Sequence, residues 1–419
     1  MRSILIVGAG QCGLQLGLSL LQSGYEVTIM SARTPEQIRG GAPTSTQGMF
    51  DQALSTERAH GLNLWDGQTP DFHGLHIALS APPGHKALDV TARLDKPGQS
   101  TDQRLKMATW LELFTERGGT VVYQGVTPAD LDQLAAQSRF DLVIVAAGRS
   151  ELSALFPRDP VRSPYTEPQR GLAVAYVHGM TPDPLFPETS VTFNAVPGLG
   201  ELFVIPSLTL SGPCDILFWE VIPGGPLDRW AAPMDPAQHL RIMLELAREH
   251  TPWVWERCGR VELTDARATL SGRYAPTVRQ PVATLPSGGR ALGAADVVVA
   301  NDPITGQGSN MAAKCAQIYY QRIVDQQDRP FDEAWMRATF EEFWATTGEA
   351  TTAWTNGMLQ PLPEHAQRLL AAASATPAVA SRLVNGFDDP NDFLGWFTTP
   401  DLADAYLAQV APDFVTPAS

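Results

Sequence analysis

The pattern of hydrophobic and polar residues changes several times along the chain, and each change predicts a different element. Four apolar residues at 4–7 end at a run of glycines, which is typical of a buried parallel strand. An apolar stretch from 14 to 21 predicts a helix, and a second apolar run at 26–30 predicts another strand. Because strand, helix and strand follow one another directly, the N-terminal region predicts a doubly wound α/β layer.

The middle of the chain first extends this layer and then leaves it. An amphipathic helix at 101–117 and apolar strands at 120–123 and 142–146 continue the α/β pattern. Between 171 and 223 the apolar runs become short or alternating and are broken by Pro and Gly, which predicts a β-rich insertion. Two further stretches are predicted to be mainly helical, 236–257 and 332–410.

The first strand and helix are joined by a G-x-G-x-x-G sequence, Gly8-Ala9-Gly10-Gln11-Cys12-Gly13. Glycines at these positions make a tight turn, let the backbone approach a pyrophosphate and let the helix pack on the strand. The sequence therefore predicts a dinucleotide site; the alternative is an ordinary glycine turn. Where a ribose-binding carboxylate would follow the second strand, the chain has Ser31, with Arg33 nearby, which predicts a weaker hold on the adenosine ribose.

A second glycine turn lies about three quarters of the way along the chain. Asp296 is followed by a predicted apolar strand at 297–301 and then by Asp302-Pro303-Ile304-Thr305-Gly306-Gln307-Gly308-Ser309-Asn310-Met311, which opens a helix. Several backbone N–H groups are unpaired at such a helix start, and the helix dipole lies behind them. The turn is therefore expected to attract an anionic or electron-rich ligand. Asp296 is a candidate to contact that ligand, or it caps the end of a strand.

Composition and charge narrow the possible functions. The chain has 419 residues, of which 44% are hydrophobic, enough for two or three subdomains with large cores. Its formal net charge of −15 argues against nucleic acid or an anionic membrane surface as a partner. No apolar run reaches the roughly 18 residues of a membrane span, and no apolar leader precedes the first strand, so a cytoplasmic protein is expected.

Cysteine and histidine give no indication of a metal site, and no metal is expected. His73, His76 and His85 lie close together, but their spacing matches no zinc pattern, so we expect surface or turn histidines. The four cysteines are scattered without a C-x-x-C spacing, and free thiols in a reducing compartment are expected for all of them, Cys12, Cys214, Cys258 and Cys315.

The order of these features resembles that of flavoprotein monooxygenases of the hydroxylase type: a nucleotide turn at the start, an Ala-Gly turn at 147–148 and a strand-to-helix turn late in the chain. More specifically, the chain resembles, nearly from end to end, the oxygenase component of the two-component styrene and indole monooxygenases, the group E flavoprotein monooxygenases. The stretches that carry the resemblance are Ile6–Gly17, Asp102–Arg104, Glu167–Arg170, Gly200–Leu202, Asp302–Met311, Trp354–Asn356 and Phe387–Pro400.

The resemblance implies an α/β fold with a Rossmann-like FAD-binding domain of the flavoprotein hydroxylase type, an inserted β-sheet substrate domain and a helical C-terminal region. It places the first part of the FAD-binding domain at residues 1–165, with an excursion at 40–100 that covers flavin and substrate. The other implied boundaries are 166–285 for the substrate domain, 286–330 for the second part of the FAD-binding domain and 331–419 for the helical subdomain.

The resemblance also implies the cofactor and a partner. FAD arrives already reduced from a separate NAD(P)H-dependent flavin reductase, by contact or by diffusion, and reacts with O₂ to give a C4a-hydroperoxyflavin. One sequence feature supports this: single-component hydroxylases usually have Asp-Gly where this chain has Ala147-Gly148, so no nicotinamide site is expected. The alternative is a tight turn that needs small residues in any case. The oligomeric state stays open, a homodimer included.

No acid–base residue is expected at the site, and the flavin and substrate are positioned by the second glycine turn, at Pro303, Gly306, Gln307, Gly308 and Asn310. Arg104 is expected either to approach the FAD pyrophosphate or to form an ion pair on a helix surface. The expected cofactor-binding residues are Gly8, Gly10, Gln11, Cys12, Gly13, Ser31, Arg33, Thr46, Arg104, Ala147, Gly148, Asp296, Gly306, Gly308, Ser309, Asn310 and Met311.

Substrate choice is expected to depend on the loop with Ser45, Gln47 and Met49. By resemblance the styrene branch has Asn, Val and His there and the indole branch has Ser, Gln and Met, so this chain matches the indole branch. The amide of Gln47 offers a partner to an indole N–H, and Met49 offers a soft contact to a flat ring; the alternative is an ordinary solvated loop. The other expected substrate residues are Phe72, Leu75, Gly98 and Pro303.

The expected reaction is therefore epoxidation of the C2=C3 bond of indole, leading to indoxyl and indigo. The alternative within the family is a styrene monooxygenase that epoxidises vinyl arenes. Two alternatives from other classes remain, an NAD-dependent dehydrogenase that uses the first glycine turn and a flavin-binding protein without oxygenase activity.

Overall fold

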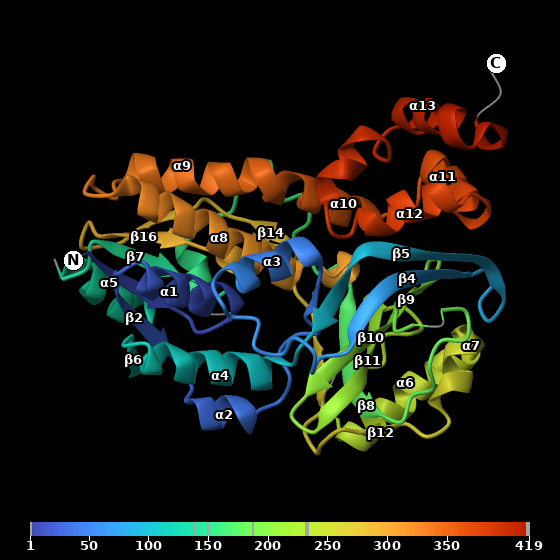
Figure 1. The fold of residues 1–419 in the computed structure, drawn as a ribbon, viewed down its shortest axis with the longest axis horizontal. Coiled ribbons are helices and arrows are strands. Elements are labelled where there is room, and N and C mark those ends of the chain that lie inside the picture. Colours follow the sequence, from blue (N-terminus) through green and yellow to red (C-terminus); the bar gives the residue numbers. More distant parts are fainter. Residues whose placement is uncertain (1, 138, 149–150, 187, 231–233, 416–419) are drawn as a thin grey trace.

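The chain folds around two β-sheets that lie side by side, with a cluster of helices from the C-terminal region above the second sheet (Figure 1). The computed structural model describes residues 2–137, 139–148, 151–186, 188–230 and 234–415. Among the helices so described, none is long and apolar enough to span a membrane.

The first sheet is a six-stranded α/β sheet in the order β15-β16-β7-β1-β2-β6. Its centre is parallel: β1 (Ser3–Val7) lies between β2 (Glu26–Ser31) and β7 (Leu142–Val145). At one edge β15 (Val282–Thr284) runs antiparallel to β16 (Arg290–Gly293). The carboxyl ends of β1 and β7 lie next to each other, which is where doubly wound sheets bind their ligands.

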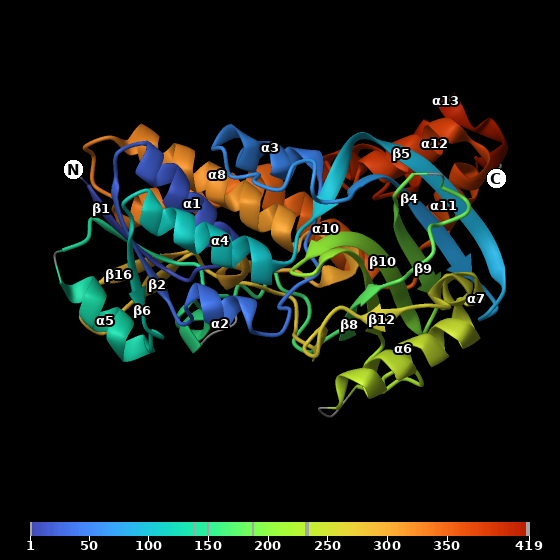
Figure 2. The ribbon, with the colours of Figure 1, turned by 60° about the horizontal axis from the view of Figure 1, so that its bottom comes forward.

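Three long helices pack against one another on this sheet (Figure 2). They are α1 (Gln11–Gln22), α4 (Gln103–Glu116) and α8 (Gly308–Gln326). The amphipathic pattern predicted for α4 is confirmed, because Trp110 and Phe114 on its inner face are fully buried. The remaining elements of this half are α2 (Pro35–Arg39), α3 (Asp51–Ala59), β6 (Thr120–Tyr123), α5 (Pro128–Ala136) and α9 (Glu333–Phe343).

The second sheet has nine strands, eight of them in the order β12-β8-β11-β10-β9-β4-β5-β3, and β13 pairs with β8. Two segments that are distant in sequence build it, because β4 and β5 come from the expected excursion at 40–100 while β8 to β13 come from the expected substrate domain at 166–285. The strands are β3 (Gly48–Met49), β4 (Asp71–Ser80), β5 (Lys86–Ser100), β8 (Gly171–His178), β9 (Val191–Val196), β10 (Gly200–Thr209), β11 (Gly212–Val221), β12 (Glu262–Leu263) and β13 (Thr269–Gly272).

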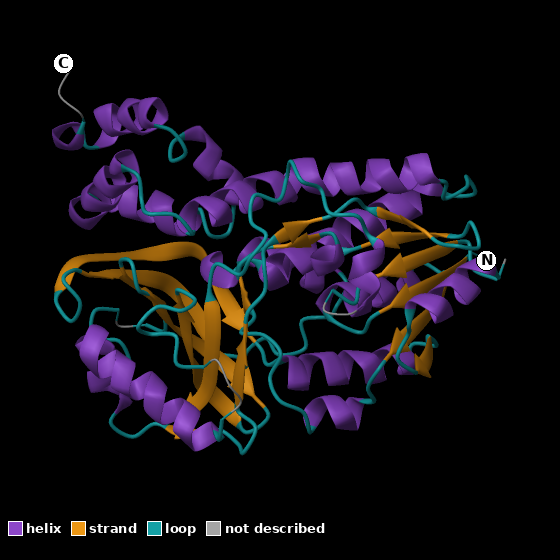
Figure 3. Ribbon diagram, turned by 180° about the vertical axis from the view of Figure 1, so that it is seen from behind, coloured by secondary structure: helices purple, strands orange, loops and turns teal. Residues whose placement is uncertain are grey.

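Helices lie on both sides of the second sheet (Figure 3), and successive side chains along each strand point to opposite faces. In β11, Phe218 belongs to the core on one face and Trp219 to the core on the other. The Trp219 face is closed by α6 (Pro236–His250) and α7 (Pro252–Trp255), and the Phe218 face by the C-terminal helices. Because both faces are covered, β10 is buried at every position, and even its polar residues, such as Glu201 and Ser207, lie away from solvent.

The C-terminal region is helical as predicted, and its helices are α10 (Glu349–Met358), α11 (Glu364–Ala375), α12 (Pro377–Asn385) and α13 (Pro400–Val410). A π-helical turn joins α9 to α10. Four large aromatic residues of this region are buried, Trp335, Phe340, Phe343 and Trp354. Of these, Trp354 joins the core of the second sheet, so the helices and the sheet form one continuous apolar layer.

The strand predicted at 297–301 is wrong. Ala295–Val297 forms a single 3₁₀ turn, and the extended part shrinks to β17 (Val299–Ala300), which pairs with β14 (Thr277–Val278). Ala295 has a φ of +49°, in the left-handed region, so the chain turns before it extends. Asp296 therefore lies in a bend rather than at the start of a strand.

Candidate functional site

The first glycine turn has the geometry of a dinucleotide cradle. Gly8 has a φ of +121°, and a Cβ on Gly13 would lie 2.1 Å from the carbonyl oxygen of Gly8, so the helix packs directly on the turn. At Gly10 an added Cβ would have no neighbour within 4 Å, which leaves the backbone there open to a ligand. The turn thus has the tight and the open positions that a pyrophosphate-binding fingerprint needs.

The side chains in this turn point away from the opening. Gln11 donates to Oε1 of Glu57 at 2.8 Å, and Cys12 forms a hydrogen bond with Cys315 of α8 in the core. This contact and burial raise the pKa of the Cys12 thiol well above its usual value, so the thiol is neutral. The residues expected to bind cofactor at 11–13 can therefore do so through their backbone N–H groups.

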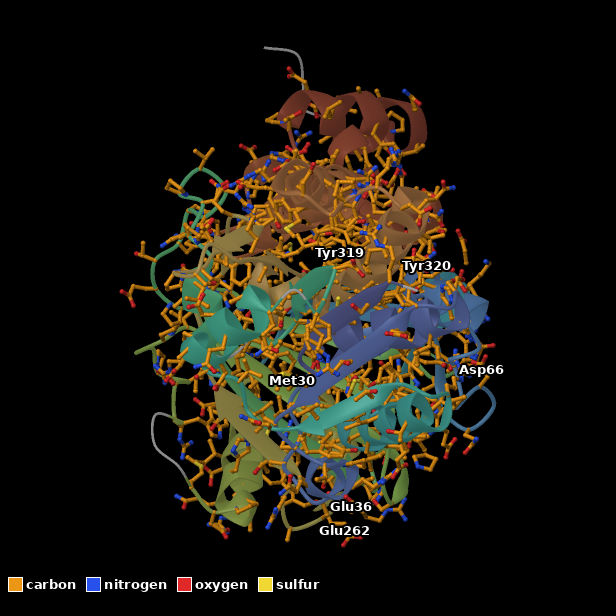
Figure 4. All side chains as sticks on the ribbon, turned by 90° about the vertical axis from the view of Figure 1, so that its left-hand side faces the viewer. Met30, Glu36, Asp66, Glu262, Tyr319 and Tyr320 are labelled. Carbon is orange, nitrogen blue, oxygen red and sulfur yellow. The ribbon has the colours of Figure 1, made fainter. Side chains whose placement is uncertain are left out.

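A cleft of about 480 Å³ opens beside this turn, at the carboxyl ends of β1, β2 and β7. Met30, labelled in Figure 4, lines it from the end of β2. Next to Met30, Ser31 donates to the carbonyl of Arg33 at 2.6 Å, so no carboxylate is present there to hold a ribose. Seven of the expected cofactor residues line the cleft, Gly8, Gly10, Ser31, Arg33, Arg104, Ala147 and Gly148.

Arg104 lies in the wall of this cleft and forms ion pairs, as one alternative expected, but it is buried rather than on a helix surface. Its side chain is 3% exposed and forms ion pairs with Asp102 at 2.8 Å and Asp265 at 2.9 Å. A third contact goes from Nη2 to the hydroxyl of Thr209 at 3.2 Å. Two carboxylates therefore compensate its charge, and the arginine ties α4 to the second sheet where the cleft ends.

The Ala-Gly turn after β7 places Asp296 at the cleft. A Cβ on Gly148 would lie 2.4 Å from the Cβ of Asp296, so glycine is needed for the two segments to approach. Ala147 and Gly148 line the cleft, and Asp296 lies directly behind them. Asp296 and the Ala-Gly turn thus lie next to each other in space, although residues 148 and 296 are far apart in the chain.

The second glycine turn presents an open helix start. Asp302 caps the turn Pro303–Thr305 by accepting the N–H of Ile304 at 3.2 Å, and Gly306 follows with a φ of +66°. Gly306 and Gly308 are exposed while their neighbours are buried, so the backbone at the start of α8 is accessible. Gln307 does not face the opening, because its Nε2 donates to the carbonyl of Phe387 at 2.8 Å.

The loop expected to choose the substrate is held from three sides. The hydroxyl of Tyr176 donates to the carbonyl of Ser45 at 2.7 Å, and the hydroxyl of Ser100 donates to the carbonyl of Thr46 at 2.9 Å. Asn310 of α8 donates to the carbonyl of Gly48 at 3.0 Å. This loop is therefore an ordered part of the site rather than a solvated connection.

Gln47 is the most unusual residue of this loop. Its φ is +52°, and its side chain is buried with 3% exposure. Among the described residues, neither its amide oxygen nor its amide nitrogen has a hydrogen-bond partner. A polar side chain that is strained and unpaired in this way is characteristic of a ligand site.

The backbone of Met49 lies next to Gly98, but its side chain packs in a different cluster from those of Phe72 and Leu75. It packs with Ala53 and Leu54 of α3 and Ala313 of α8, and Nζ of Lys106 lies 3.4 Å from its sulfur atom. Lys106 in turn pairs with Glu57 at 2.5 Å, and burial lowers the pKa of this lysine. Met49 thus faces the helices of the first sheet, whereas Phe72 and Leu75 belong to the core of the second.

The apolar part of the site is an aromatic wall. The ring of Phe72 packs over Gly98, where a Cβ would lie 2.1 Å from the ring, so glycine makes room for it. Phe50 contacts Phe72 with 5.7 Å between ring centroids and Phe387 with 6.0 Å. Strand β4, the loop before α3 and the segment after α12 therefore meet at one place.

Comparison with known proteins identifies the family. Residues 148–257 match the family model described as "Styrene monooxygenase A putative substrate binding domain". Over 418 residues the chain is 30% identical to styrene monooxygenase StyA of Pseudomonas fluorescens, covering 97% of this chain and 98% of that protein. The chain belongs to the styrene monooxygenase A family.

Solved structures share the fold at low sequence identity. The flavoprotein/dehydrogenase from Cytophaga hutchinsonii has a TM-score of 0.67 at 14% identity, covering 97% of this chain and 99% of that one. The flavin-dependent brominase Bmp2 has a TM-score of 0.66 at 14% identity, covering 97% and 98%. The expected fold class is thereby confirmed: this styrene monooxygenase A family member has the α/β fold of FAD-dependent monooxygenases and halogenases, with a substrate-binding domain and a helical C-terminal region.

One histidine of this family member differs from expectation. His76 is not a surface histidine: it is buried in β4, with Nδ1 2.6 Å from Asp183 and Nε2 2.6 Å from Asp89. His85 is exposed, as expected. In the part of the chain that the structure describes, no three His, Cys, Asp or Glu side chains are grouped so as to hold a metal ion.

Sequence reasoning missed several site residues of the styrene monooxygenase A fold. Phe50, Tyr176 and Phe387 line or anchor the substrate loop, yet each looks like an ordinary core aromatic in sequence. Phe387 begins a stretch that carried the family resemblance, which was the one available signal. Their roles arise from contacts between distant segments, which no local pattern reports.

Proposed function

We propose that this flavin-dependent monooxygenase takes reduced FAD from a separate NAD(P)H-dependent reductase and epoxidises the C2=C3 bond of indole, leading to indoxyl and indigo. The observation that carries the proposal is the buried, unpaired amide of Gln47. Leaving a buried polar group unpaired costs about 1–3 kcal/mol, so a ligand that pairs with it is favoured. The N–H of indole is a donor for this amide oxygen, whereas styrene has no polar atom to offer.

FAD fits the cleft and turns described above. The backbone N–H groups at 11–13 would hold the pyrophosphate, with Arg33 beside them, and the open helix start at Gly306 and Gly308 would stabilise negative charge on the flavin ring. When bound in reduced form, FAD together with O₂ supplies an electrophilic oxygen atom. The chain itself then contributes no acid or base to the transfer.

The contribution of the chain is positioning and exclusion of water. Oxygen transfer requires the C=C bond to lie within roughly 3–3.5 Å of the reactive oxygen atom. Phe50 and Phe72, whose rings pack edge to face, supply apolar contacts for an aromatic ring, and Gln47 fixes the orientation of an N–H on that ring. Because this wall is continuous with the core of the second sheet, water is kept from the reacting atoms.

The absence of carboxylates at two positions supports a cofactor that exchanges readily rather than one that stays tightly bound. Ser31 occupies the position at which a ribose-binding carboxylate is usual, and Ala147 the position of the Asp found in single-component hydroxylases. Both residues line the cleft. A weaker hold on the adenosine half suits exchange of FAD with a reductase.

The direct test is to mix the protein with chemically reduced FAD, air and indole in the absence of any reductase. Formation of indigo under these conditions supports the proposal, and its absence together with unreacted indole contradicts it. Oxidation of NADH without a reductase would instead favour a dehydrogenase. FAD binding without any product would favour a flavin-binding protein.

Substrate choice is tested with the exchange Gln47→Val and Met49→His, made singly and together. Because Gln47 is unpaired and Met49 packs among helices, the single Gln47→Val variant is expected to account for most of the change. We expect the ratio of indole to styrene turnover to fall at least tenfold, which corresponds to about 1.4 kcal/mol. An unchanged ratio in the double variant would favour a styrene monooxygenase that does not use this loop for selection.

A further inference from the structure

Three buried carboxyl groups and one buried arginine lie together behind the turn that carries Pro303. Glu201 of β10 and Glu220 of β11 are directly opposite each other, and Asp302 begins the turn. Glu220 is 0% exposed, Asp302 is 3% exposed and Arg170 is 7% exposed. Such a group of charges is costly to bury unless every member is paired.

Arg170 is fully engaged by one of the three carboxylates. Its Nε donates to Oε2 of Glu201 at 2.8 Å and its Nη2 donates to Oε1 of Glu201 at 3.0 Å. This is the two-pronged geometry in which guanidinium and carboxylate neutralise each other best. Glu220 and Asp302 are left without a cation of their own.

Glu220 faces Asp302. Among the described residues, no donor group provides a hydrogen bond to either oxygen of Glu220, and the side chain that does meet it is the carboxyl of Asp302. Two ionised carboxylates do not share a buried site, so one of them holds a proton. Burial and the nearby carboxylates raise the pKa of Glu220 well above its usual value and that of Asp302 to about 6. At neutral pH Glu220 is thus the donor and Asp302 the acceptor.

The acid pair connects two parts of the site. Glu220 lies in β11 on the same face as Phe218, which is the face with the aromatic wall. Asp302 caps the turn with Ile304, which packs in that same core, and the turn leads through Gly306 into α8. The shared proton is therefore the polar link between the second sheet and the open helix start.

We propose that Glu220 and Asp302 form a proton-sharing pair that positions the turn at 303–306, and with it the flavin-facing start of α8, against the second sheet. The inference rests on the proposed function, because that function assigns the turn to the flavin. Glu220 is a positioning residue: its proton stays between the two carboxyl groups and is not transferred to substrate. When alkaline pH removes this proton, the two carboxylates repel each other, the turn is released and affinity for FAD falls.

The test compares Glu220→Gln, Glu220→Leu and the unmodified protein. Gln keeps a donor for Asp302 but cannot titrate, whereas Leu removes the donor. We expect Glu220→Gln to bind FAD within about threefold of the unmodified protein at neutral pH and to lose the decline in affinity at alkaline pH. Glu220→Leu is expected to bind FAD at least tenfold more weakly at neutral pH.

Infrared spectroscopy of the FAD-free protein gives a readout that does not depend on cofactor binding. A buried carboxylic-acid C=O band is expected at about pH 7.5 in the unmodified protein and not in Glu220→Gln. Asp215 is the matched control, since it lies in the same strand on the opposite face and its pKa is raised to about 6 by burial. Asp215→Asn is therefore expected to keep both the band and the pH profile of FAD binding.

The outcomes separate this inference from the proposed function. If the unmodified protein binds FAD but Glu220→Gln shows the same infrared band or the same alkaline decline, the acid pair is refuted and the function is untouched. If the unmodified protein binds no FAD at any pH, the proposed function itself fails, whatever the infrared band shows.

Discussion

Asn310 holds Phe50 in place: Oδ1 of Asn310 accepts the backbone N–H of Phe50 at 2.8 Å. The amide nitrogen of the same side chain donates to the carbonyl groups of Gly48 and Gly306, each at 3.0 Å. One residue of α8 therefore fixes the distance between the loop that carries Gln47 and the turn assigned to the flavin.

Replacing Asn310 with Ala is expected to loosen this connection. The change removes three hydrogen bonds to partly buried backbone groups, which predicts a loss of about 1–3 kcal/mol in the free energy of unfolding. We also expect slower indole oxidation and a larger share of reducing equivalents lost as hydrogen peroxide, measured by product and peroxide assays. Asn310→Asp keeps the acceptor for the backbone N–H of Phe50. Its free energy of unfolding and its peroxide yield should therefore lie between those of the unmodified protein and of Asn310→Ala. If Asn310→Ala still converted all of its reduced FAD into product, Asn310 would not be needed to fix the loop against the turn.

Gly10→Ala separates cofactor binding from folding. A Cβ at this position meets nothing within 4 Å, and the residue has an ordinary extended backbone, so the variant should fold with an unchanged melting temperature. The same methyl group would stand where the pyrophosphate approaches, and we expect FAD affinity to fall at least tenfold in a fluorescence titration. Gly272→Ala, which also meets nothing within 4 Å but lies in β13 away from the cleft, is the control. Equal FAD affinity of Gly10→Ala and Gly272→Ala would contradict the assignment of the pyrophosphate to this turn.

Gln47→Leu is expected to stabilise the FAD-free protein. The substitution removes two buried polar atoms that have no partner among the described residues, so the free energy of unfolding should rise by about 1–2 kcal/mol in a urea titration. Gln15→Leu provides a contrast, because the amide of Gln15 bonds Gln11 and Thr56 and its loss should destabilise. A destabilised Gln47→Leu would show that this amide is paired in solution and would weaken its assignment to indole.

The burial of His239 predicts that the protein loses stability in acid. This histidine lies in α6 and is buried beside Trp230. Burial lowers its pKa to about 4, whereas a histidine in the unfolded chain has a pKa near 6.5. The unfolded state therefore binds the proton first, so stability present above about pH 6.5 is lost as the pH falls toward 4, by up to about 3 kcal/mol. His239→Gln should flatten this part of the stability profile, and His85→Gln, at an exposed site, should not. Parallel profiles for all three proteins would disprove the assignment.

Local patterns in the sequence were sufficient for four strands of the first sheet, β1, β2, β6 and β7, whereas β15 and β16 were not predicted. The strand at 120–123 and the helix at 101–117 were predicted within two residues of their ends, because turn residues and apolar spacing mark them clearly. The glycine turn at Gly8 was recognisable for the same reason. The strand at 297–301 failed because three valines suggest extension, while the positive φ of Ala295 and the approach to Gly148 impose a bend.

Relations between distant segments were beyond sequence reasoning. That β4 and β5 join the strands of the β-rich insertion in one sheet depends on the parallel pairing of β4 with β9, which no short-range signal encodes. The buried Gln47 and its neighbours illustrate the same limit. Its residue type suggested a contact to substrate, but its missing partners and its strain became visible only with the fold.

The aromatic wall has a consequence for how the protein is made. Phe50 and Phe72 leave the ribosome early, whereas Phe387 and α12, which cover them, are synthesised late. Until then, one apolar face of the second sheet is open to water and to other nascent chains. Chains interrupted before α12 should consequently aggregate through this open face.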